Sequence, residues 1–95
     1  MRLALYSSGP KSATPNLVAL QDETLTALPT VLVCPLKAGI ALTALRVEVR
    51  WGKDTLVVCG DLARPIRRTA LRPFGHLDEA VSREIMRRFL QLLAR

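Results

Sequence analysis

The stretch "RVEVRWGKDTLVVC", Arg46 to Cys59, contains the clearest folding signal in the sequence. Val47, Val49 and Trp51 alternate with charged residues, so one face of a strand is apolar and the other is charged. The letters "GKD" are typical of a turn, and "TLVVC" returns as a second apolar strand. The stretch therefore predicts a β-hairpin with one buried face.

The residues before this hairpin predict a succession of short strands. The segments "RLALY" (Arg2–Tyr6) and "NLVALQ" (16–21) flank a loop rich in Ser, Gly and Pro, which turns the chain. The run "TVLVCPL" (Thr30–Leu36) is apolar, rich in β-branched residues and ended by Pro35. It predicts a central strand covered on both faces. Residues 38–45 ("AGIALTAL") fit either a turn of helix or an irregular segment.

Two prolines shape the segment that follows the hairpin, "GDLARPIRRTALRPFGHLDEA" (Gly60–Ala80). Pro65 and Pro73 exclude a long helix through it, because proline lacks the N–H group and clashes with the preceding helical turn. The short apolar pieces, Ile66 and Ala70–Leu71, suit a brief edge strand.

A change of apolar period marks one helix near the end of the sequence. Apolar residues recur every three or four positions, which predicts an amphipathic helix over residues 78–93. Asp78 is the expected N-cap, and Glu79–Arg83 and Glu84–Arg88 are favourable i,i+4 pairs worth about 0.2–0.5 kcal/mol each. The apolar stripe consists of Leu77, Val81, Ile85, Phe89, Leu92 and Leu93.

The apolar face of this helix is wider than the stripe, because Met86 and Leu90 extend it. The extra width indicates either a second partner, such as another copy of the chain, or only a broader cover for the sheet. For the first alternative, the candidate residues of a homodimer interface are Phe89, Leu90, Leu92 and Leu93.

These elements together predict one α+β domain over residues 1–95. Five or six antiparallel strands over about residues 2–72 form a small, SH3-like, strongly bent sheet or partly open barrel, followed by the helix over about residues 78–93. We expect a single core in which Ile85 clusters with Val31, Val33, Val49 and Trp51.

The charge of the chain favours anionic partners. The formal net charge is +6, and residues 61–95 hold eight arginines against four acidic residues. Such a balance suits nucleic acid or an acidic protein segment. Four arginines fall within nine residues and form either a recognition surface or a solvated loop; they are Arg64, Arg67, Arg68 and Arg72.

The sequence offers no metal site, no cofactor site and no catalytic set. His76 is the single histidine, and no Gly-rich phosphate loop precedes a helix. Cys34 and Cys59 lie in apolar runs and are expected as small buried residues, although a bridge is possible if their strands are neighbours. Asp61 follows a strand and is expected to form a turn rather than to act in catalysis.

No apolar run approaches the roughly 18 residues of a membrane span, and the first residues lack the apolar core of a secretory signal. We therefore expect a cytoplasmic protein with reduced thiols and no membrane partner.

The order of these motifs resembles the CcdB-type toxins of bacterial toxin–antitoxin pairs. Those proteins have a strand ending in a V-Q-S/D-like turn, a connection rich in Asp and Leu, and a buried strand closing in V-x-P-L. Residues 57–93 are similar to the family's later strand, its D-x-A-x-P-like segment and the opening of its terminal helix. The MazF-type ribonuclease toxins share this fold. In this sequence the early CcdB-type motifs, which are the strand with its turn, the connection and the buried strand, match Val18–Asp22, Leu25, Leu28–Pro29 and Val31–Leu36.

The sequence also departs from both branches of the superfamily. CcdB-type toxins poison DNA gyrase through residues at the very end of the terminal helix, commonly an aromatic, a glycine and an aliphatic residue, whereas no aromatic residue follows Phe89 here. MazF-type enzymes use an arginine in the first long loop and a hydroxyl residue after the strand that ends in P-L. This chain has Lys11 in that loop and Lys37 after Leu36. The general acid/base and phosphate-stabilising groups of the family's ribonucleases are therefore missing.

The resemblance implies a type II toxin-like homodimer nearer the CcdB branch, which binds gyrase or RNA, is neutralised by an acidic antitoxin and needs no cofactor. The alternatives are a MazF-like endoribonuclease with displaced catalytic residues and a non-toxic, basic nucleic-acid-binding barrel. The candidate residues for binding target or antitoxin are Lys11, Lys37, Arg64, Arg67, Arg68 and Arg72.

Overall fold

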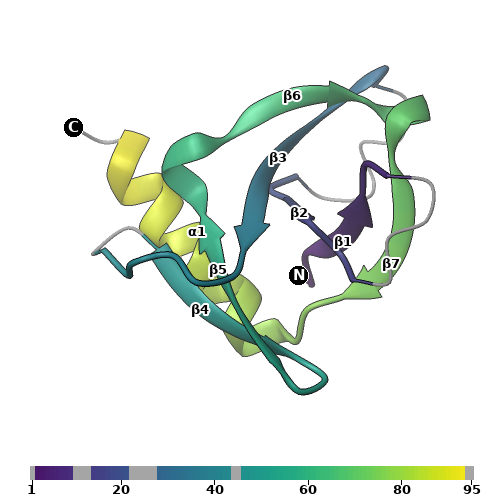
Figure 1. The fold of residues 1–95 in the computed structure, drawn as a ribbon. Helices are drawn as coiled ribbons and strands as arrows, with labels where there is room; N and C mark the ends of the chain where they lie inside the picture. The colour runs from purple at the N-terminus through teal and green to yellow at the C-terminus, as the bar shows by residue number, and fades with distance from the viewer. Residues whose placement is uncertain (1, 10–13, 22–27, 44–45, 94–95) are drawn as a thin grey trace.

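The computed structural model describes residues 2–9, 14–21, 28–43 and 46–93. Within these ranges, seven strands precede one helix, and two 3₁₀ turns, Gly60–Leu62 and Arg68–Ala70, flank the sixth strand (Figure 1). The elements are β1 (Ala4–Ser7), β2 (Leu17–Ala19), β3 (Thr30–Lys37), β4 (Arg46–Trp51), β5 (Asp54–Cys59), β6 (Arg64–Arg67), β7 (Arg72–His76) and α1 (Glu79–Leu93).

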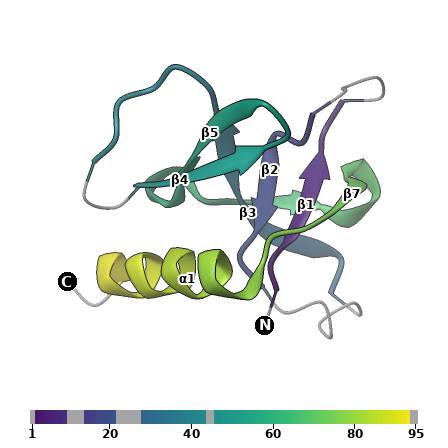
Figure 2. The same ribbon diagram turned by 90° about the horizontal axis from the view of Figure 1, so that it is seen from below.

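The strands form one antiparallel sheet in the order β4-β5-β3-β2-β1-β7, and β6 pairs with β3 beside this path. The sheet curls strongly on itself into a half-barrel, as Figure 1 shows. Helix α1 lies along one side of the curl and faces β4 (Figure 2). The predicted fold class, mainly β with a C-terminal helix on a strongly bent sheet, is confirmed.

The predicted hairpin is confirmed as β4 and β5, whose register pairs Trp51 with Asp54 across a two-residue turn. The first turn residue, Gly52, has φ +59°, and no other residue type has positive φ in the described part of the chain. Gly52 with positive φ before Lys53 with negative φ is the pattern of a type II′ turn, which matches the twist of the flanking strands. Glycine is needed at this position because it carries no Cβ.

Strand β3 is the most connected strand, because three others pair with it. Its N–H groups at Leu32 and Leu36 point towards the β2 side, where they donate to Gln21 Oε1 at 2.7 Å and to the Asn16 carbonyl at 2.8 Å. The alternate positions face the opposite edge. That edge pairs with β6 over Thr30–Val33 and with β5 over Leu36–Lys37. Pro35 lies between the two partners, so its missing N–H leaves no ladder bond unmade.

The predicted end of the strands at about residue 72 is wrong, because β7 continues to His76. This strand pairs with β1, with Ala4 opposite His76 and Ser7 opposite Arg72, and the register shifts between Leu5 and Tyr6. Pro73 obscured the strand in the sequence, yet proline is tolerated here because β7 is an edge strand. Of the ambiguous segment 38–45, residues 38–43 form neither helix nor strand.

The expected single core is also wrong, because the two faces of the curled sheet carry separate clusters. Val49 and Ile85 belong to the larger cluster, against which Trp51 packs, whereas Val31 and Val33 belong to the smaller one. Strand β3 contributes to both clusters, because neighbouring side chains of a strand point to opposite faces of the sheet. The members of the smaller cluster are Ala4, Leu17, Ala19, Val31 and Val33.

An aromatic pair joins the two ends of the sheet. Trp51 on β4 and Phe74 on β7 lie at opposite ends of the strand order, and their rings meet edge to face with centroids 6.1 Å apart. Both side chains pack against the larger core. Because such pairs are worth about 0.5–1.5 kcal/mol beyond their buried area, this contact helps to hold the half-barrel closed.

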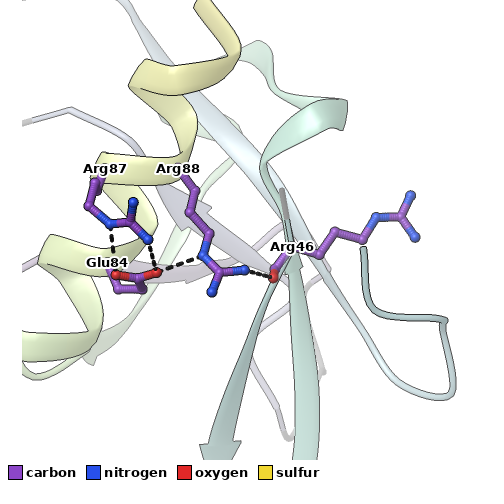
Figure 3. A network of polar contacts seen from close by, with 4 residues as sticks. All are labelled: Arg46, Glu84, Arg87 and Arg88. Carbon is purple, nitrogen blue, oxygen red and sulfur yellow. Dashed lines mark hydrogen bonds and ion pairs between the residues drawn. The ribbon is translucent and has the colours of Figure 1, made fainter. Parts of the chain in front are cut away.

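Helix α1 begins as the sequence predicted and is fixed to the sheet at both ends. The Asp78 carboxylate accepts a hydrogen bond from the Val81 N–H at 2.8 Å, which confirms the N-cap. The buried Ser82 hydroxyl accepts from the Leu3 N–H at 2.9 Å. Near the other end, Arg88 Nη1 donates to the Arg46 carbonyl at 2.9 Å (Figure 3).

Glu84 organises the arginines of this helix. Its carboxylate accepts two hydrogen bonds from Arg87, at 2.7 and 3.1 Å, and one from Arg88 at 2.6 Å, as Figure 3 shows. The bonds from Arg87, then those from Arg88, lower the pKa of Glu84 from 4.5 to about 2. The same carboxylate thereby orients Arg88 towards the Arg46 carbonyl. The predicted pairs Glu84–Arg88 and Glu79–Arg83 are both present, the latter at 3.7 Å.

Both cysteines are fully buried and free, as expected for small core residues. Burial, followed by the nearby Cys59 and Asp61, raises the pKa of the Cys34 thiol to about 12. A thiol that stays protonated is a poor nucleophile and a poor metal ligand. Cys34 therefore serves packing.

Replacing Val33 with alanine tests the smaller core. Val33 is fully buried there, so Val33→Ala should lower the free energy of unfolding by about 1–3 kcal/mol through lost burial and a residual cavity. Chemical denaturation measures the change. Thr55→Ala, at an exposed position of β5, is the control and should change stability by less than about 0.5 kcal/mol. Equal midpoints for Val33→Ala and the unaltered chain would contradict the burial of this position.

Acid should remove the contribution of Glu84 to stability. Its folded pKa lies below its ordinary value, so its stabilising effect is complete above about pH 4.5 and is lost as the pH falls through about 2. Glu84→Gln should therefore be less stable than the unaltered chain at pH 7, and the difference should shrink between pH 4.5 and pH 2. The effect is small because 35% of the side chain is exposed. Glu48→Gln is the control, and a difference that does not depend on pH would contradict the assignment.

Candidate functional site

A surface pocket of about 490 Å³ lies where β3 changes partners. After β5 the chain makes the 3₁₀ turn Gly60–Leu62 and returns to the same edge of β3 as β6. The space between the two pairings, beside Pro35, is therefore open. The lining residues are Asn16, Leu17, Pro35, Leu36, Lys37, Leu62, Ala63 and Arg64.

The pocket carries two positive charges and no carboxylate in its lining. Lys37 closes β3 and Arg64 opens β6, so both are held by strand backbone while their side chains are exposed. Within the described residues neither forms an ion pair. An un-neutralised lysine and arginine around one concave surface attract phosphate or carboxylate groups, and arginine can bind either with two parallel hydrogen bonds.

Asn16 supplies the pocket's polar wall and is rigidly placed. Its side-chain amide donates to the Ser8 hydroxyl at 3.0 Å, and its side-chain oxygen accepts from the Ser8 N–H at 3.1 Å. Its backbone N–H donates to the Tyr6 carbonyl at 3.0 Å. These bonds tie the start of β2 to the end of β1, so the pocket is preformed on this side.

The turn that borders the pocket is fixed by an ion pair. Arg46 on β4 reaches Asp61 with Nε and Nη2, at 3.2 and 3.1 Å from the two carboxylate oxygens. The hydrogen bonds from Arg46 lower the pKa of Asp61, and Asp61 raises the pKa of Arg46. Asp61 therefore anchors the 3₁₀ turn, consistent with the expected structural role.

The structure places the four clustered arginines in different surroundings. Arg64 lines the pocket, and Arg67 is exposed on β6. Arg68 donates through Nε to the Leu28 carbonyl at 3.1 Å, and the Arg72 guanidinium lies 5.5 Å from the centre of the Phe74 ring. Arg68 and Arg72 therefore contribute to local structure, and they do not line the pocket.

Two further predicted site residues differ in what the structure says of them. Lys37 lines the pocket beside Arg64, a juxtaposition that the sequence did not predict because the two are 27 positions apart. Lys11 lies outside the described residues. Sequence reasoning also missed Asn16, whose only signal was its position between Pro15 and an apolar strand.

The helix residues proposed for a homodimer interface split into two groups. Leu90 and Leu93 are 56% and 63% exposed, whereas Phe89 and Leu92 are half-buried. Phe89 packs against the larger core, so part of the apolar face does cover the sheet. The two exposed leucines, together with Leu62 at 42%, leave apolar surface open towards the end of α1.

The described residues hold no set of metal ligands and no membrane-spanning segment. No group of three or more His, Cys, Asp or Glu residues is placed to bind a metal ion within the described ranges. In those same ranges, no helix has both the length and the apolar composition needed to cross a membrane.

Comparison with known proteins finds a structural relative and no sequence relative. Neither a protein-family model nor a curated protein sequence matches the chain. A chain in the crystal structure of MazE–MazF (Form II) from Deinococcus radiodurans is similar in structure, with a TM-score of 0.73. The match covers 97% of this chain and 89% of that chain at 14% sequence identity. At this identity the likeness concerns the fold, and the half-barrel described above is the MazF-like fold.

Proposed function

We propose that this chain is the toxin component of a type II toxin–antitoxin pair. The observation that carries the proposal is structural similarity over 97% of the chain to a chain of the MazE–MazF complex. The positive charge of the pocket supports it, because a basic pocket suits an acidic partner or a nucleic-acid target. The net charge of +6 points the same way.

RNA is the target that the pocket supports best. Lys37 and Arg64 flank a cavity large enough for a nucleotide-sized group, within the usual 300–1,000 Å³ of ligand sites. Lysine neutralises a phosphate as a point charge, and arginine binds it through its planar fork. Nothing described here favours gyrase as the target, and gyrase poisoning stays a prediction from the resemblance alone.

The chemistry of the lining favours binding over cleavage. Asn16, Lys37 and Arg64 supply the polar side chains of the pocket, and none of them is a hydroxyl or a carboxylate. An amide and two cations stabilise negative charge, but they do not take a proton from a ribose hydroxyl at neutral pH. A MazF-like endoribonuclease remains the second candidate, because the two cations are suited to stabilising a charged transition state.

Neutralisation by an acidic antitoxin fits the distribution of exposed cations. Arg67 is exposed on β6, the same strand on which Arg64 borders the pocket. An acidic segment that bound along this strand would cover the pocket and exclude the target. Arg67 is therefore a candidate for antitoxin binding.

Expression and RNA assays test the proposed function. Induced expression in a bacterial host should arrest growth, and the purified chain should bind a long single-stranded RNA. Lys37→Gln with Arg64→Gln should abolish the arrest and lower the log–log salt slope of RNA binding by about 1.4, because each lost phosphate contact contributes about 0.7. The matched control is Lys53→Gln with Arg83→Gln, which removes the same charge outside the pocket.

The outcomes separate the candidate functions. RNA fragments that depend on Lys37 and Arg64 would establish the endoribonuclease, and binding without fragments would establish action by binding. RNA binding without growth arrest would identify a non-toxic nucleic-acid-binding barrel. Growth that continues after induction, without any RNA binding, would contradict the proposal.

Substitution of the exposed leucines of α1 tests the proposed homodimer. Leu90 and Leu93 should become buried against a second copy across a two-fold axis. Sedimentation at micromolar concentration should show a dimer, and Leu90→Lys with Leu93→Lys should yield monomers that retain the unaltered chain's circular dichroism. A monomer at all concentrations before any substitution would overturn the dimer.

A further inference from the structure

The outer edge of β4 carries backbone groups that the fold leaves open. In a two-residue hairpin the residues beside the turn, Trp51 and Asp54, exchange hydrogen bonds, and bonded pairs then alternate along the ladder. Val49 and Val47 are therefore bonded to β5. The N–H and C=O groups of Arg46, Glu48 and Arg50 point away from it.

The backbone N–H and C=O groups of Arg46 both have hydrogen-bond partners within the chain. Its N–H donates to the Thr43 carbonyl at 3.1 Å, and its carbonyl accepts from Arg88 Nη1 at 2.9 Å. These two bonds confirm that Arg46 faces outward. Within the described residues the corresponding groups of Glu48 and Arg50 have no partner, and neither side chain forms an ion pair. Two residues of strand edge are therefore available to another chain.

A second pocket of about 490 Å³ lies against these two residues. Four consecutive residues of β4, Glu48 to Trp51, form one wall. The opposite wall comes from the junction of β7 and α1 and comprises His76, Leu77, Asp78 and Val81. Both end strands of the sheet, β4 and β7, thus contribute to this pocket without pairing with each other. The pocket contains both open hydrogen-bonding groups and apolar side chains.

We propose that an extended peptide segment of the acidic partner protein adds to β4 at Glu48 and Arg50 as a further strand. A single extended chain suits the site because the open groups belong to only two described residues of β4, beside a pocket of about 490 Å³ that the β7–α1 junction bounds. Only the identity of the protein that carries the segment rests on the proposed function. The open edge and its pocket are properties of this chain alone.

The pocket also determines which side chains the segment carries. In an antiparallel addition, a residue opposite Arg50 shares its face and should be acidic, and a residue opposite Glu48 should be basic. The residue between them points to the other face, where Val49, Trp51 and Val81 offer apolar contacts. The recognised pattern is therefore acidic–apolar–basic, read from the N-terminus of the segment.

A synthetic peptide tests the geometry directly. The probe is acetyl-Thr-Val-Glu-Leu-Lys-Val-Thr-amide, titrated into the full chain. In the free chain the amides of Glu48 and Arg50 should exchange rapidly with solvent, and the peptide should protect both. N-methylation of the peptide's Glu should weaken binding at least about tenfold, because it removes a ladder bond. N-methylation of its Leu, whose N–H points away from β4, is the matched control and should preserve the affinity within about twofold.

An exchange of charges identifies the edge that binds. Glu48→Arg with Arg50→Glu should prefer the peptide in which Glu and Lys are exchanged. Glu79→Arg with Arg83→Glu, a matched exchange on the exposed face of α1, should leave the preference unaltered. Equal sensitivity to both N-methyl groups, or no binding at millimolar peptide, would overturn the proposal. Concentration-dependent protection of the two amides without peptide would show that a second copy occupies the edge, and this would also overturn it.

These outcomes are independent of the tests of function. Growth arrest and RNA binding depend on Lys37 and Arg64, which lie in the other pocket. Peptide binding in a chain that does not arrest growth would contradict the proposed function and leave the strand addition standing. Growth arrest without peptide binding would contradict the strand addition and leave the proposed function standing.

Discussion

The break in the outer edge of β3 is the constraint on which the rest of the structure depends. Pro35 cannot donate a ladder bond, and the edge it interrupts is shared by β6 on one side and β5 on the other. The chain must therefore leave the sheet between these strands, which it does in the 3₁₀ turn Gly60–Leu62. The basic pocket opens beside this point.

Two sets of charged contacts hold the elements around this break. Arg46 fixes the 3₁₀ turn through Asp61, and Arg88, oriented by Glu84, binds the Arg46 carbonyl. The same strand end thus connects the turn beside the pocket to the terminal helix. Several of the arginines that make the chain basic are therefore engaged in contacts within the chain. The exposed cations Lys37 and Arg64, by contrast, line the pocket beside Pro35.

The two pockets lie on different parts of the sheet and differ in chemistry. The pocket beside Pro35 has cations and an amide in its wall, which suits phosphate. The pocket beside β4 has open backbone groups above apolar side chains, which suits an extended peptide. The two pockets share no lining residue, so the fold offers these two kinds of surface at separate places.

The sequence by itself determined the β4–β5 hairpin, the capped helix and the bent antiparallel sheet, because alternation, turn residues and helical period are local signals. The sequence did not predict strand β7, because Pro73 argues against a strand and because β7 pairs with β1, which lies far away in the sequence. The division of the core had the same origin: the face on which Val33 lies follows from the curl of the whole sheet. The meeting of Lys37 with Arg64, and the tethering of Arg68 and Arg72 away from them, were decided only by the tertiary structure. Charge in a sequence gives the sign of a surface, whereas strand pairing between distant residues decides which charges share a cavity.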